Sequence, residues 1–427
     1  MISRSWLSVL PFIHSALGQS SLGLPFNTSG RDILYADGSV FPGYAGTNWP
    51  GHQQAMVPEG LQYSSIEDVV SKIKAFGLNA VRVTFAIEML DDIIDNGGDK
   101  TLQETFEIAL GAGNGSLVLE DVLANNPQFN ATTTRLQVFD EVAAEFGRQE
   151  IYLHLDNHMS GASWCCGDAD GNTWWGDEQF DADKWIRGWG YIAGHAAANW
   201  PTFASVGLRN ELRGPPNGVG EPYDWYTWYE RMTAAADAVH EAAPDALIFF
   251  SGLDYDTHMS EIPLGMELTG TDGTSTEGKS ATFIPSDFPY EKKIALELHK
   301  YDFEETQASC EEFISGFYNS GFQALDPDNE ETVYPFPVAI TEYGFIQDGE
   351  YYNSTTYNEC MIQFVETYKA GFFQWDVAGS YYIQTKDGAT IQDKDEEWGL
   401  LNHDWSDTRS QVTVDNSLLK MVDALLS

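Results

Sequence analysis

The sequence predicts an α/β fold, a single (β/α)8 TIM barrel with long insertions after some of its strands. Short runs of β-branched and aliphatic residues alternate with longer stretches of helical spacing along the 427 residues. A closed barrel explains eight such units in one chain, because an open doubly wound sheet would carry a glycine-rich phosphate-binding turn or a similar switch-point feature, and we find none. Barrels with insertions reach this length as one domain.

The predicted strands are residues 44–49, 79–85, 151–158, 205–211, 246–252, 293–299, 336–344 and 371–376. The predicted helices include residues 64–77, 133–147 and 224–244. At the ends of the first of these helices, Ser65 and Asp68 resemble a capping box and Gly77 resembles a C-cap. We see no linker, repeat or low-complexity tail that would divide the chain.

Three insertions follow the carboxyl ends of predicted strands, at residues 88–130, 159–180 and 253–290. In a barrel, the loops at this end build the active-site face. The third insertion is rich in Gly, Ser and Thr, so disorder is the alternative for it.

The first 18 residues have the pattern of a secretory signal peptide. Arg4 precedes an apolar stretch at residues 6–13, and small residues follow at the expected cleavage site. A buried apolar segment is the alternative. No later run approaches the roughly 18 apolar residues that span a bilayer. We therefore expect a secreted, extracellular mature chain in which residues 19–427 form one domain.

Two further features agree with export. The chain has four N-glycosylation sequons, at Asn27, Asn114, Asn130 and Asn353. Its four cysteines allow three disulfide connectivities, as expected for an oxidising compartment. The loop between Cys310 and Cys360 favours that pair, whereas the adjacent Cys165 and Cys166 could bridge only through a strained vicinal ring. A zinc site is the alternative, although the chain has no CxxC pair.

The charge of the chain limits its partners. Asp and Glu number 65 and Lys and Arg 22, which gives a formal net charge of −43. Such a field repels phosphate backbones and anionic lipid headgroups, so we expect neither nucleic acid nor membrane as a partner. A neutral or cationic partner is favoured, and we expect a monomer.

Polar and aromatic residues gather where the predicted strands end. They are Arg82, His158, Asn210, Glu211, His299, Tyr301, Glu342 and Trp375. Taken singly, each could be an ion-pair member, a core histidine or a packing residue. Together they lie at one end of successive strands and include two carboxylates on different strands. Glycosidic cleavage needs such a pair, one to protonate the leaving oxygen and one to attack or to activate water.

In their order along the chain, these residues resemble glycoside hydrolase family 5, the retaining, cellulase-like (β/α)8 group. The resemblance covers about residues 43–403 and rests on Arg82, "LDNH" (155–158), "RNE" (209–211), "HKY" (299–301), "TEYG" (341–344) and Trp375. It implies that Glu211 is the acid/base and Glu342 the nucleophile. It further implies a 2-hydroxyl contact for Asn210, bonds from Arg82 and Tyr301 to Glu342, a subsite lined by His158 and His299, and a sugar platform at Trp375.

Elementary electrostatics agrees with this division of roles. Arg82 should lower the pKa of Glu342, and the resulting negative charge should raise the pKa of Glu211. We expect no cofactor and no metal ion.

Some positions depart from the family pattern, so the resemblance does not fix the substrate. Leu212 and Arg213 follow the Asn-Glu pair where Pro and a small residue or His are usual. Trp185, Trp189, Trp225 and Trp228 have helical spacing and should pack in the core. Trp49, Trp164, Trp174, Trp175 and Trp398 lie at strand ends or in loops and could stack on sugars, although the tryptophans from Trp164 to Trp175 could instead close the loop under its cysteines.

The sequence thus predicts a secreted retaining glycosidase, an endo-β-1,4-glucanase acting on a β-linked polysaccharide or oligosaccharide. An exo-β-glucosidase, a β-mannanase or another β-glycosidase on the same barrel is the alternative. A metal-dependent hydrolase would use His154, Asp156 and His158, which alternate onto one strand face, but it would leave both glutamates without a role. An inactive carbohydrate-binding barrel is disfavoured because both glutamates are present.

Overall fold

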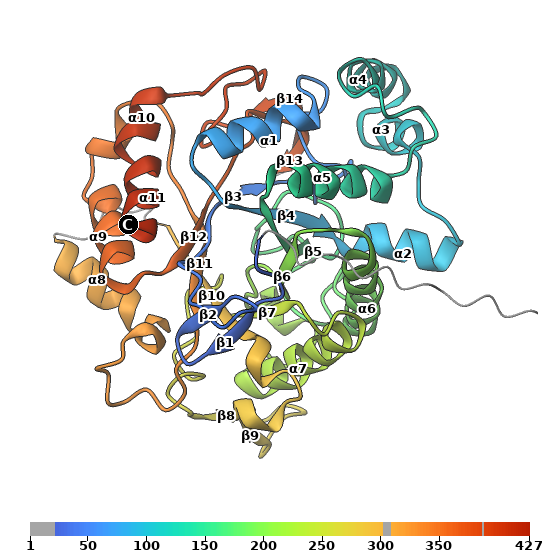
Figure 1. The fold of residues 1–427 in the computed structure, drawn as a ribbon. Coiled ribbons are helices and arrows are strands. Elements are labelled where there is room, and N and C mark those ends of the chain that lie inside the picture. Colours follow the sequence, from blue (N-terminus) through green and yellow to red (C-terminus); the bar gives the residue numbers. More distant parts are fainter. Residues whose placement is uncertain (1–21, 302–308, 387) are drawn as a thin grey trace, which may run out of the picture.

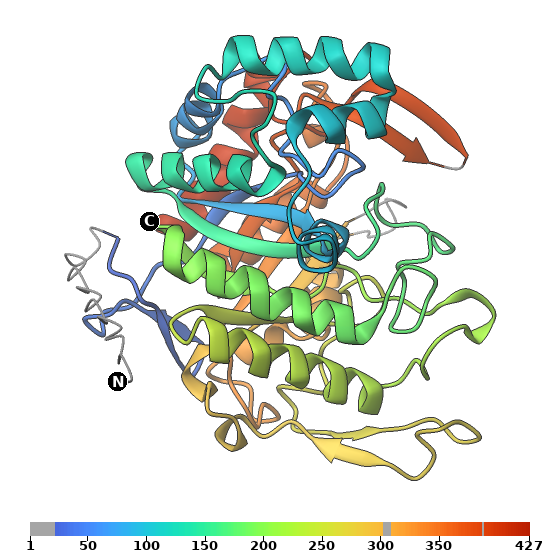
Figure 2. The same cartoon turned by 90° about the vertical axis from the view of Figure 1, so that its right-hand side faces the viewer.

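A computed structural model of the protein describes residues 22–301, 309–386 and 388–427. The predicted signal peptide, residues 1–18, lies outside the described residues. Figure 1 shows helices arranged around a central barrel, and Figure 2 shows the barrel from the side, with the N-terminal hairpin at one end and the long insertions at the other.

The barrel is closed and has the strand order β10-β11-β12-β3-β4-β5-β6-β7. Every neighbouring pair in it is parallel. Its strands are β3 (Ala45–Trp49), β4 (Ala80–Ala86), β5 (Tyr152–Met159), β6 (Phe203–Gly207), β7 (Leu247–Ser251), β10 (Ile294–Lys300), β11 (Val338–Tyr343) and β12 (Gly371–Gln374). The predicted (β/α)8 class is confirmed.

Two predicted strands end two or more residues earlier in the structure, and site residues lie just past both ends. Strand β6 stops at Gly207, so Asn210 and Glu211 lie in the loop that follows. Glu211 has a φ of 48°, a left-handed conformation that cannot continue a strand. Strand β12 stops at Gln374, and Trp375 lies just past its end.

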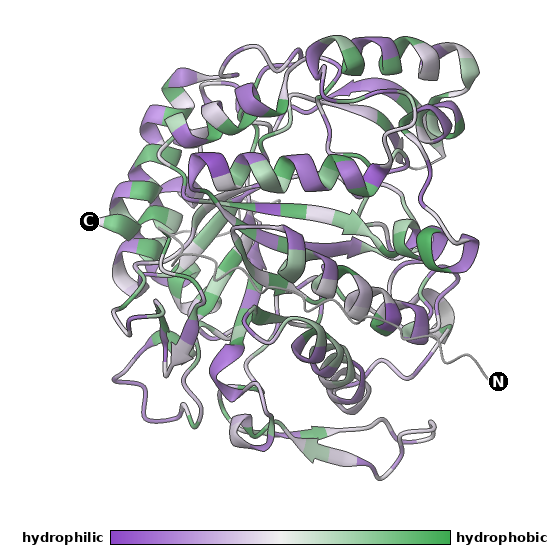
Figure 3. Ribbon diagram, turned by 45° about the vertical axis from the view of Figure 1, so that its right-hand side comes forward, coloured by the Kyte–Doolittle hydropathy of each residue, from purple (hydrophilic) through white to green (hydrophobic). Residues whose placement is uncertain are grey.

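The helices are α1 (Ile66–Ala75), α2 (Ile87–Asn96), α3 (Leu102–Leu110), α4 (Ala112–Asn125), α5 (Arg135–Gln149), α6 (Ala182–Asn199), α7 (Trp225–Ala242), α8 (Cys310–Tyr318), α9 (Tyr357–Tyr368), α10 (Gln411–Asn416) and α11 (Leu418–Leu426). Ser65 caps α1 by accepting the backbone N–H of Asp68 at 3.1 Å, and Gly77 follows the helix with a φ of 77°. Ser65 is confirmed as the N-cap, but the reciprocal bond of a capping box is not formed, and the C-cap is Phe76, one residue before Gly77. Figure 3 shows apolar and polar residues interleaved along the outer helices, because one face of each packs on the barrel.

Among the described residues, three short antiparallel hairpins complete the sheet structure: β1 (Asn27–Ser29) with β2 (Asp32–Leu34), β8 (Glu267–Thr269) with β9 (Ser280–Thr282), and β13 (Ser380–Lys386) with β14 (Ala389–Asp395). The β8–β9 hairpin occupies the Gly-, Ser- and Thr-rich insertion, so the alternative of disorder there is wrong. The insertion at residues 88–130 is largely helical, since it contains most of α2 and all of α3 and α4.

The N-terminal end of the barrel is closed by aromatic side chains. Phe26, Phe41, Tyr44 and Tyr152 form a buried cluster there with small and apolar residues at the strand starts. The rings of Phe26 and Phe41 stack with a centroid distance of 4.6 Å. The segment before β3 therefore plugs this end of the barrel, and the opposite end is left for polar residues.

All four cysteines are in disulfides. Cys310 is bonded to Cys360, which joins α8 to α9 and confirms the favoured pair. Cys165 is bonded to Cys166 in the insertion after β5. No free thiol is left for a zinc ion, so the zinc alternative is wrong.

Two surface features bear on the other sequence predictions. Asn114, Asn130 and Asn353 are exposed and Asn27 is half-buried, so all four could meet solvent, and their glycosylation stays a prediction. Among the described residues, no helix is both long and apolar enough to cross a membrane.

Candidate active site

The eight predicted site residues meet at the carboxyl end of the barrel. Arg82, His158, His299 and Glu342 are in β4, β5, β10 and β11, and Asn210, Glu211, Tyr301 and Trp375 lie just past β6, β10 and β12. Hydrogen bonds and ring contacts connect them to one another. The expected convergence is therefore observed for the complete set.

Arg82 is the hub of the site and is fully buried inside the barrel. One terminal nitrogen donates to Glu342 Oε1 at 2.7 Å and to Asn48 Oδ1 at 2.8 Å. The other donates to Asp156 Oδ1 at 2.8 Å and to Asn210 Oδ1 at 2.7 Å. Because the guanidinium is a rigid planar fork, these four bonds fix the partners relative to one another.

Glu342 has donors on both carboxylate oxygens, since Tyr301 Oη donates to Oε2 at 2.9 Å. Burial raises the pKa of Glu342 above its ordinary value, while the positive charge of Arg82 and, when it is protonated, of His299 acts in the opposite direction. Arg82 lowers this pKa, as predicted, but the net shift is upward. In this water-excluded position, the desolvation of the carboxylate outweighs the arginine.

Glu211 is held by its backbone as well as by its side chain. Its N–H donates to Asp256 Oδ2 at 2.8 Å, and its Oε1 lies 3.0 Å from His299 Nδ1. Burial raises the pKa of Glu211 to about 7, with Arg213 and Arg82 opposing the rise. The predicted direction is confirmed, but its main cause is desolvation and not a neighbouring negative charge.

Asp256 is a site residue that sequence reasoning missed. It is fully buried, its carboxylate accepts the Glu211 N–H, and its carbonyl accepts the His299 N–H at 2.8 Å. Asp254, Tyr255 and Asp256 all have left-handed backbones, with φ values of 51°, 61° and 56°. Such a turn has no periodic signal in the sequence, so nothing marked Asp256 within its long insertion.

Asn48 and Asp156 were also missed as site residues, although a signal existed for both. Asn48 is the next-to-last residue of β3 and therefore lies at the same barrel end as the predicted set. Asp156 alternates with His158 on β5, and its Oδ2 lies 2.7 Å from His158 Nδ1. Both could have been found by asking which polar residues share a strand face with the predicted ones.

His158 and Trp375 form the apolar floor of the site. Their rings are nearly parallel, with an interplanar angle of 16° and a centroid distance of 5.2 Å. His52, also missed, lies against His158 with a centroid distance of 4.0 Å. Burial lowers the pKa of His158 well below its ordinary value, so the ring is neutral and packs as an aromatic.

The two carboxyl groups lie close together. One oxygen of Glu211, one oxygen of Glu342 and one nitrogen of His299 all lie within 4.8 Å of each other. Burial lowers the pKa of His299 to about 4, so this histidine is neutral between the two acids. Two carboxyls at this spacing, one with a raised pKa, can divide acid/base and nucleophilic work.

Metal-ligand geometry gives little support to the metal-dependent alternative. Among the described residues, two groups of three could reach one ion: Cys165, Cys166 and Glu211, and Glu211, His299 and Glu342. The cysteines of the first group are disulfide-bonded and offer no thiolate. This alternative was suggested by His154, Asp156 and His158. Among the described residues, these three do not form a group that could reach one ion.

The tryptophans separate into packing and rim residues. Trp185, Trp189 and Trp228 are fully buried, as predicted, whereas Trp225 is half-buried. Trp49, Trp174 and Trp175 are also fully buried, so the prediction that they could stack on sugars is wrong. Trp164 and Trp398 stay half-buried at the site, with their rings 5.2 Å from Tyr381 and 5.6 Å from Tyr301.

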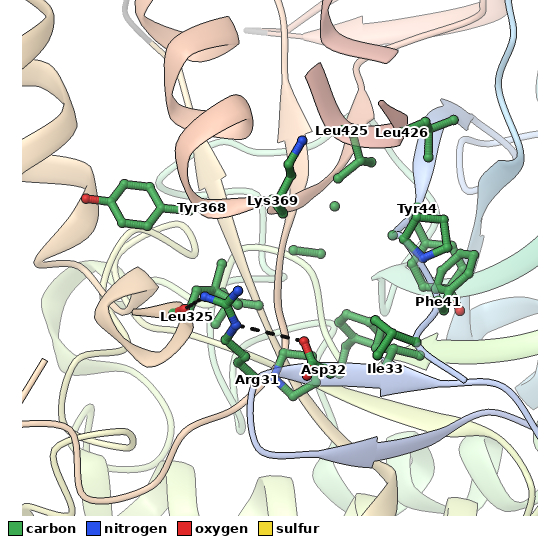
Figure 4. Close-up of a pocket in the computed structure, with 18 of the residues that line it drawn as sticks. Arg31, Asp32, Ile33, Phe41, Tyr44, Leu325, Tyr368, Lys369, Leu425 and Leu426 are labelled. Atoms are coloured by element: carbon green, nitrogen blue, oxygen red, sulfur yellow. Dashed lines mark hydrogen bonds and ion pairs between the residues drawn. The ribbon is translucent and has the colours of Figure 1, made fainter. Parts of the chain in front are cut away.

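A separate cavity of about 260 Å³ lies at the opposite, N-terminal end of the barrel. Figure 4 shows Arg31 and Asp32 at its wall, with Leu325, Tyr368 and Leu425 around them. Asp32 is the one acidic side chain among the lining residues, and none of the eight site residues is present. This cavity therefore lacks the paired carboxyls that the other end provides.

A (β/α)8 barrel with two adjacent glutamates at its carboxyl end defines the class of glycoside hydrolases, enzymes that hydrolyse O-glycosyl bonds. Comparison with known proteins agrees, because residues 36–380 match the model of the family described as Cellulase (glycosyl hydrolase family 5). The chain belongs to this family.

The similar proteins include a glycosyl hydrolase 5 family protein and an endoglucanase. A glycosyl hydrolase 5 family protein of Chamaecyparis obtusa is 28% identical over 91% of this chain, and an endoglucanase of Paenibacillus polymyxa is 24% identical over 57%. The matched regions span 65% and 54% of those two relatives.

Solved structures share the fold. The catalytic domain of the major endoglucanase from Xanthomonas campestris pv. campestris has a TM-score of 0.64 and 16% identity, covering 93% of this chain and 99% of that one. A cellotetraose complex of an endocellulase from Pyrococcus horikoshii has a TM-score of 0.65 and 16% identity, covering 95% and 99%.

Proposed function

We propose that the protein is a secreted, retaining endo-β-1,4-glucanase. The observation that carries the retaining mechanism is the spacing of Glu211 and Glu342, whose nearest carboxyl oxygens lie within 4.8 Å. Retaining glycosidases hold their carboxyls about 5–5.5 Å apart, whereas inverting enzymes leave room for a water at about 6.5–9.5 Å.

In the first step, Glu342 attacks the anomeric carbon and forms a covalent glycosyl ester. Glu211 donates its proton to the departing glycosidic oxygen, for which a pKa of about 7 suits it. Arg82 and Tyr301 donate to Glu342 and hold its attacking oxygen in place. In the second step, Glu211 removes a proton from water, the water attacks the anomeric carbon, and Glu342 leaves as a carboxylate.

The endo-acting β-1,4-glucanase assignment is supported by the names of similar proteins, which include two endoglucanases and an endocellulase crystallised with cellotetraose. Secretion is supported by the leader pattern in residues 1–18 and by two disulfides. Sequencing of protein recovered from the medium of a secreting host should find a mature N-terminus at residue 19.

The function is tested by the product lengths released from a panel of β-1,4-glucan, mixed-linkage β-glucan, β-1,3-glucan and mannan. We expect oligosaccharides of several lengths from β-1,4-glucan at early times. Glu342→Gln should abolish their release, and Glu359→Gln, which makes the same charge change at an exposed position of α9, should not. Early release of monosaccharide alone would contradict the endo assignment, and activity confined to mannan would contradict the substrate.

A further inference from the structure

The Cys165–Cys166 disulfide lies directly against the candidate catalytic residues. The side-chain nitrogen of Asn210 lies 3.4 Å from Cys165 Sγ and 3.5 Å from Cys166 Sγ. One carboxyl oxygen of Glu211 lies within 4.8 Å of both sulfurs. The other polar atom of the Asn210 amide, Oδ1, accepts from Arg82, so its nitrogen is the atom directed toward the disulfide.

Strong contacts hold the loop that carries this disulfide. Arg213, which is almost fully buried, donates to the Gly167 carbonyl at 3.0 Å and to Asp170 Oδ2 at 2.5 Å. The same guanidinium donates to the Glu211 carbonyl at 2.8 Å, which joins the loop to the acid/base residue. Arg213 therefore anchors the loop, and this explains the charged residue that departs from the family pattern.

The other side of the loop is fixed as well. The Trp164 ring packs edge-on against Tyr381 of β13, with a centroid distance of 5.2 Å. Arg209 donates to the Asn172 carbonyl at 2.6 Å farther along the loop. Because contacts to β13 and to the segment after β6 both hold it, the loop keeps the disulfide at the centre of the site.

The chemistry of a disulfide differs from that of the surrounding polar groups. Both cysteines are half-buried, so this pair is not sealed inside the core. Divalent sulfur is polarizable, donates no hydrogen bond and accepts only weakly. Such a surface can pack against the C–H groups of a sugar. A polar substituent that contacts it loses its hydrogen bonds to water and gains no hydrogen bond in exchange.

We propose that the Cys165–Cys166 disulfide is a substrate-contacting wall of the cleavage subsite, beside the 2-position of the sugar that becomes attached to Glu342, and that it rejects 2-substituents larger than hydroxyl. The inference rests on the proposed function, because the role of Asn210 sets the place of the 2-hydroxyl. The two sulfur atoms then determine the specificity, and Arg213 holds the loop that carries them.

The first test compares two aryl β-cellobiosides, one with a 2-hydroxyl and one with a 2-acetamido group on the sugar next to the scissile bond. We expect the unmutated enzyme to prefer the hydroxyl substrate in kcat/KM by at least about 100-fold. Cys165→Ala with Cys166→Ala should reduce that preference about tenfold. Cys310→Ala with Cys360→Ala is the matched control and should keep it. An unchanged preference in a Cys165/Cys166 variant that still hydrolyses the hydroxyl substrate would overturn the inference.

A second test needs no cysteine substitution. Glu342→Gln protein is treated with tris(2-carboxyethyl)phosphine and an alkylating reagent, with and without cellotetraose, and mass spectrometry follows each disulfide. Saturating cellotetraose should slow the reduction of Cys165–Cys166 at least about tenfold and leave Cys310–Cys360 unchanged.

Calorimetric titration of the same variant with cellotetraose tests the proposed substrate separately from the proposed role of the Cys165–Cys166 disulfide. Binding without protection of Cys165–Cys166 would overturn the inference and leave the proposed function standing. Failure to bind cellotetraose at all would overturn the proposed substrate, and with it this inference.

Discussion

The two ends of the barrel are built from the same strands but by opposite rules. At the N-terminal end, Phe26, Phe41, Tyr44 and Tyr152 fill the opening with stacked and edge-on rings. The hydroxyls of this cluster are satisfied, since Tyr44 Oη lies 3.1 Å from Ser205 Oγ and Tyr152 donates to the Leu22 carbonyl at 2.6 Å.

At the carboxyl end, charged groups are buried instead. Arg82 has no exposed surface, and burial raises the pKa of Asp156 to about 6, of Glu211 to about 7 and of Glu297 to about 8. The pKa is raised because the charged form of each carboxyl is better solvated in the unfolded chain than in the folded protein. The N-terminal end therefore stabilises the fold, whereas the buried charges of the carboxyl end reduce stability and hold the site residues in a fixed geometry.

The largest expected effect is on the chemistry of the carboxyl end. Glu342→Gln should lower kcat by about 10⁴-fold or more, because no nucleophile is left to form the glycosyl intermediate. The free energy of unfolding should not fall, since a buried carboxyl is replaced by a neutral isostere. Steady-state kinetics and urea unfolding measure the two quantities. A loss of stability that parallels the loss of activity would break the contrast between the two ends.

Glu211→Gln should behave differently, because it removes an acid/base and not the nucleophile. An aryl glycoside whose leaving group needs no proton should still glycosylate Glu342, and azide should then accelerate release of the intermediate. Product analysis should find a β-glycosyl azide with this variant and none with Glu342→Gln. Azide rescue of the Glu342 variant would instead reverse the two assignments.

The second effect concerns the N-terminal end and is one of stability alone. Phe41→Ala should lower the free energy of unfolding by about 3–5 kcal/mol, because it leaves a cavity in the aromatic plug. Its kcat per folded molecule should equal that of the unmutated enzyme. Val40→Ala, one residue away and 57% exposed, is the control and should change neither quantity measurably. A fall in kcat for Phe41→Ala would mean that the two ends are coupled.

The third effect is on pH dependence. Glu211 must be protonated to act as an acid, so kcat/KM should fall about tenfold per pH unit above pH 7, through the pKa of about 7. Initial rates on cello-oligosaccharides between pH 4 and pH 9 measure this limb, and Glu342 contributes the acid limb of the bell. A rate that stays flat into alkaline pH would contradict the assignment of Glu211.

The smallest effect is on stability as a function of pH. Because the pKa of Glu297 is raised to about 8, the folded state keeps a proton that the unfolded chain loses near its ordinary pKa of 4.5. The proton on Glu297 stabilises the folded state. Its contribution to the free energy of unfolding is fully present below the pKa of the unfolded chain and is lost as pH rises through the pKa of the folded state, at up to about 1.4 kcal/mol per pH unit. Melting temperatures between pH 5 and pH 8 should decline, less steeply in Glu297→Gln, and an equal slope in that variant would exclude the contribution.

The contrast between the ends also explains what the sequence could predict. Apolar runs located all of the barrel strands, and the polar residues at their carboxyl ends identified Glu211 and Glu342. The ends of β6 and β12 were misplaced, because β6 stops at Gly207 and β12 at Gln374 without any change in residue type that would mark the end. The sequence predicted an element correctly where a regular pattern of buried residues defines that element.

The remaining features depend on tertiary contacts. Asp256 became a site residue through a turn of consecutive left-handed residues, and Trp174 and Trp175 became core residues by folding under their own loop. The sign of the Glu342 pKa shift follows from its burial, which no local pattern reports. The placement of the Cys165–Cys166 disulfide against Asn210 likewise required the folded loop.

The central claim is that Glu342 attacks the anomeric carbon while Glu211 serves as acid and then as base. Proton NMR of the first products from a β-linked cello-oligosaccharide tests this most directly, because two displacements preserve the configuration of the anomeric carbon. We expect the β-anomer to appear first and the α-anomer to grow later by mutarotation. An initial α-anomer would mean a single displacement by water, and it would contradict the nucleophilic role of Glu342.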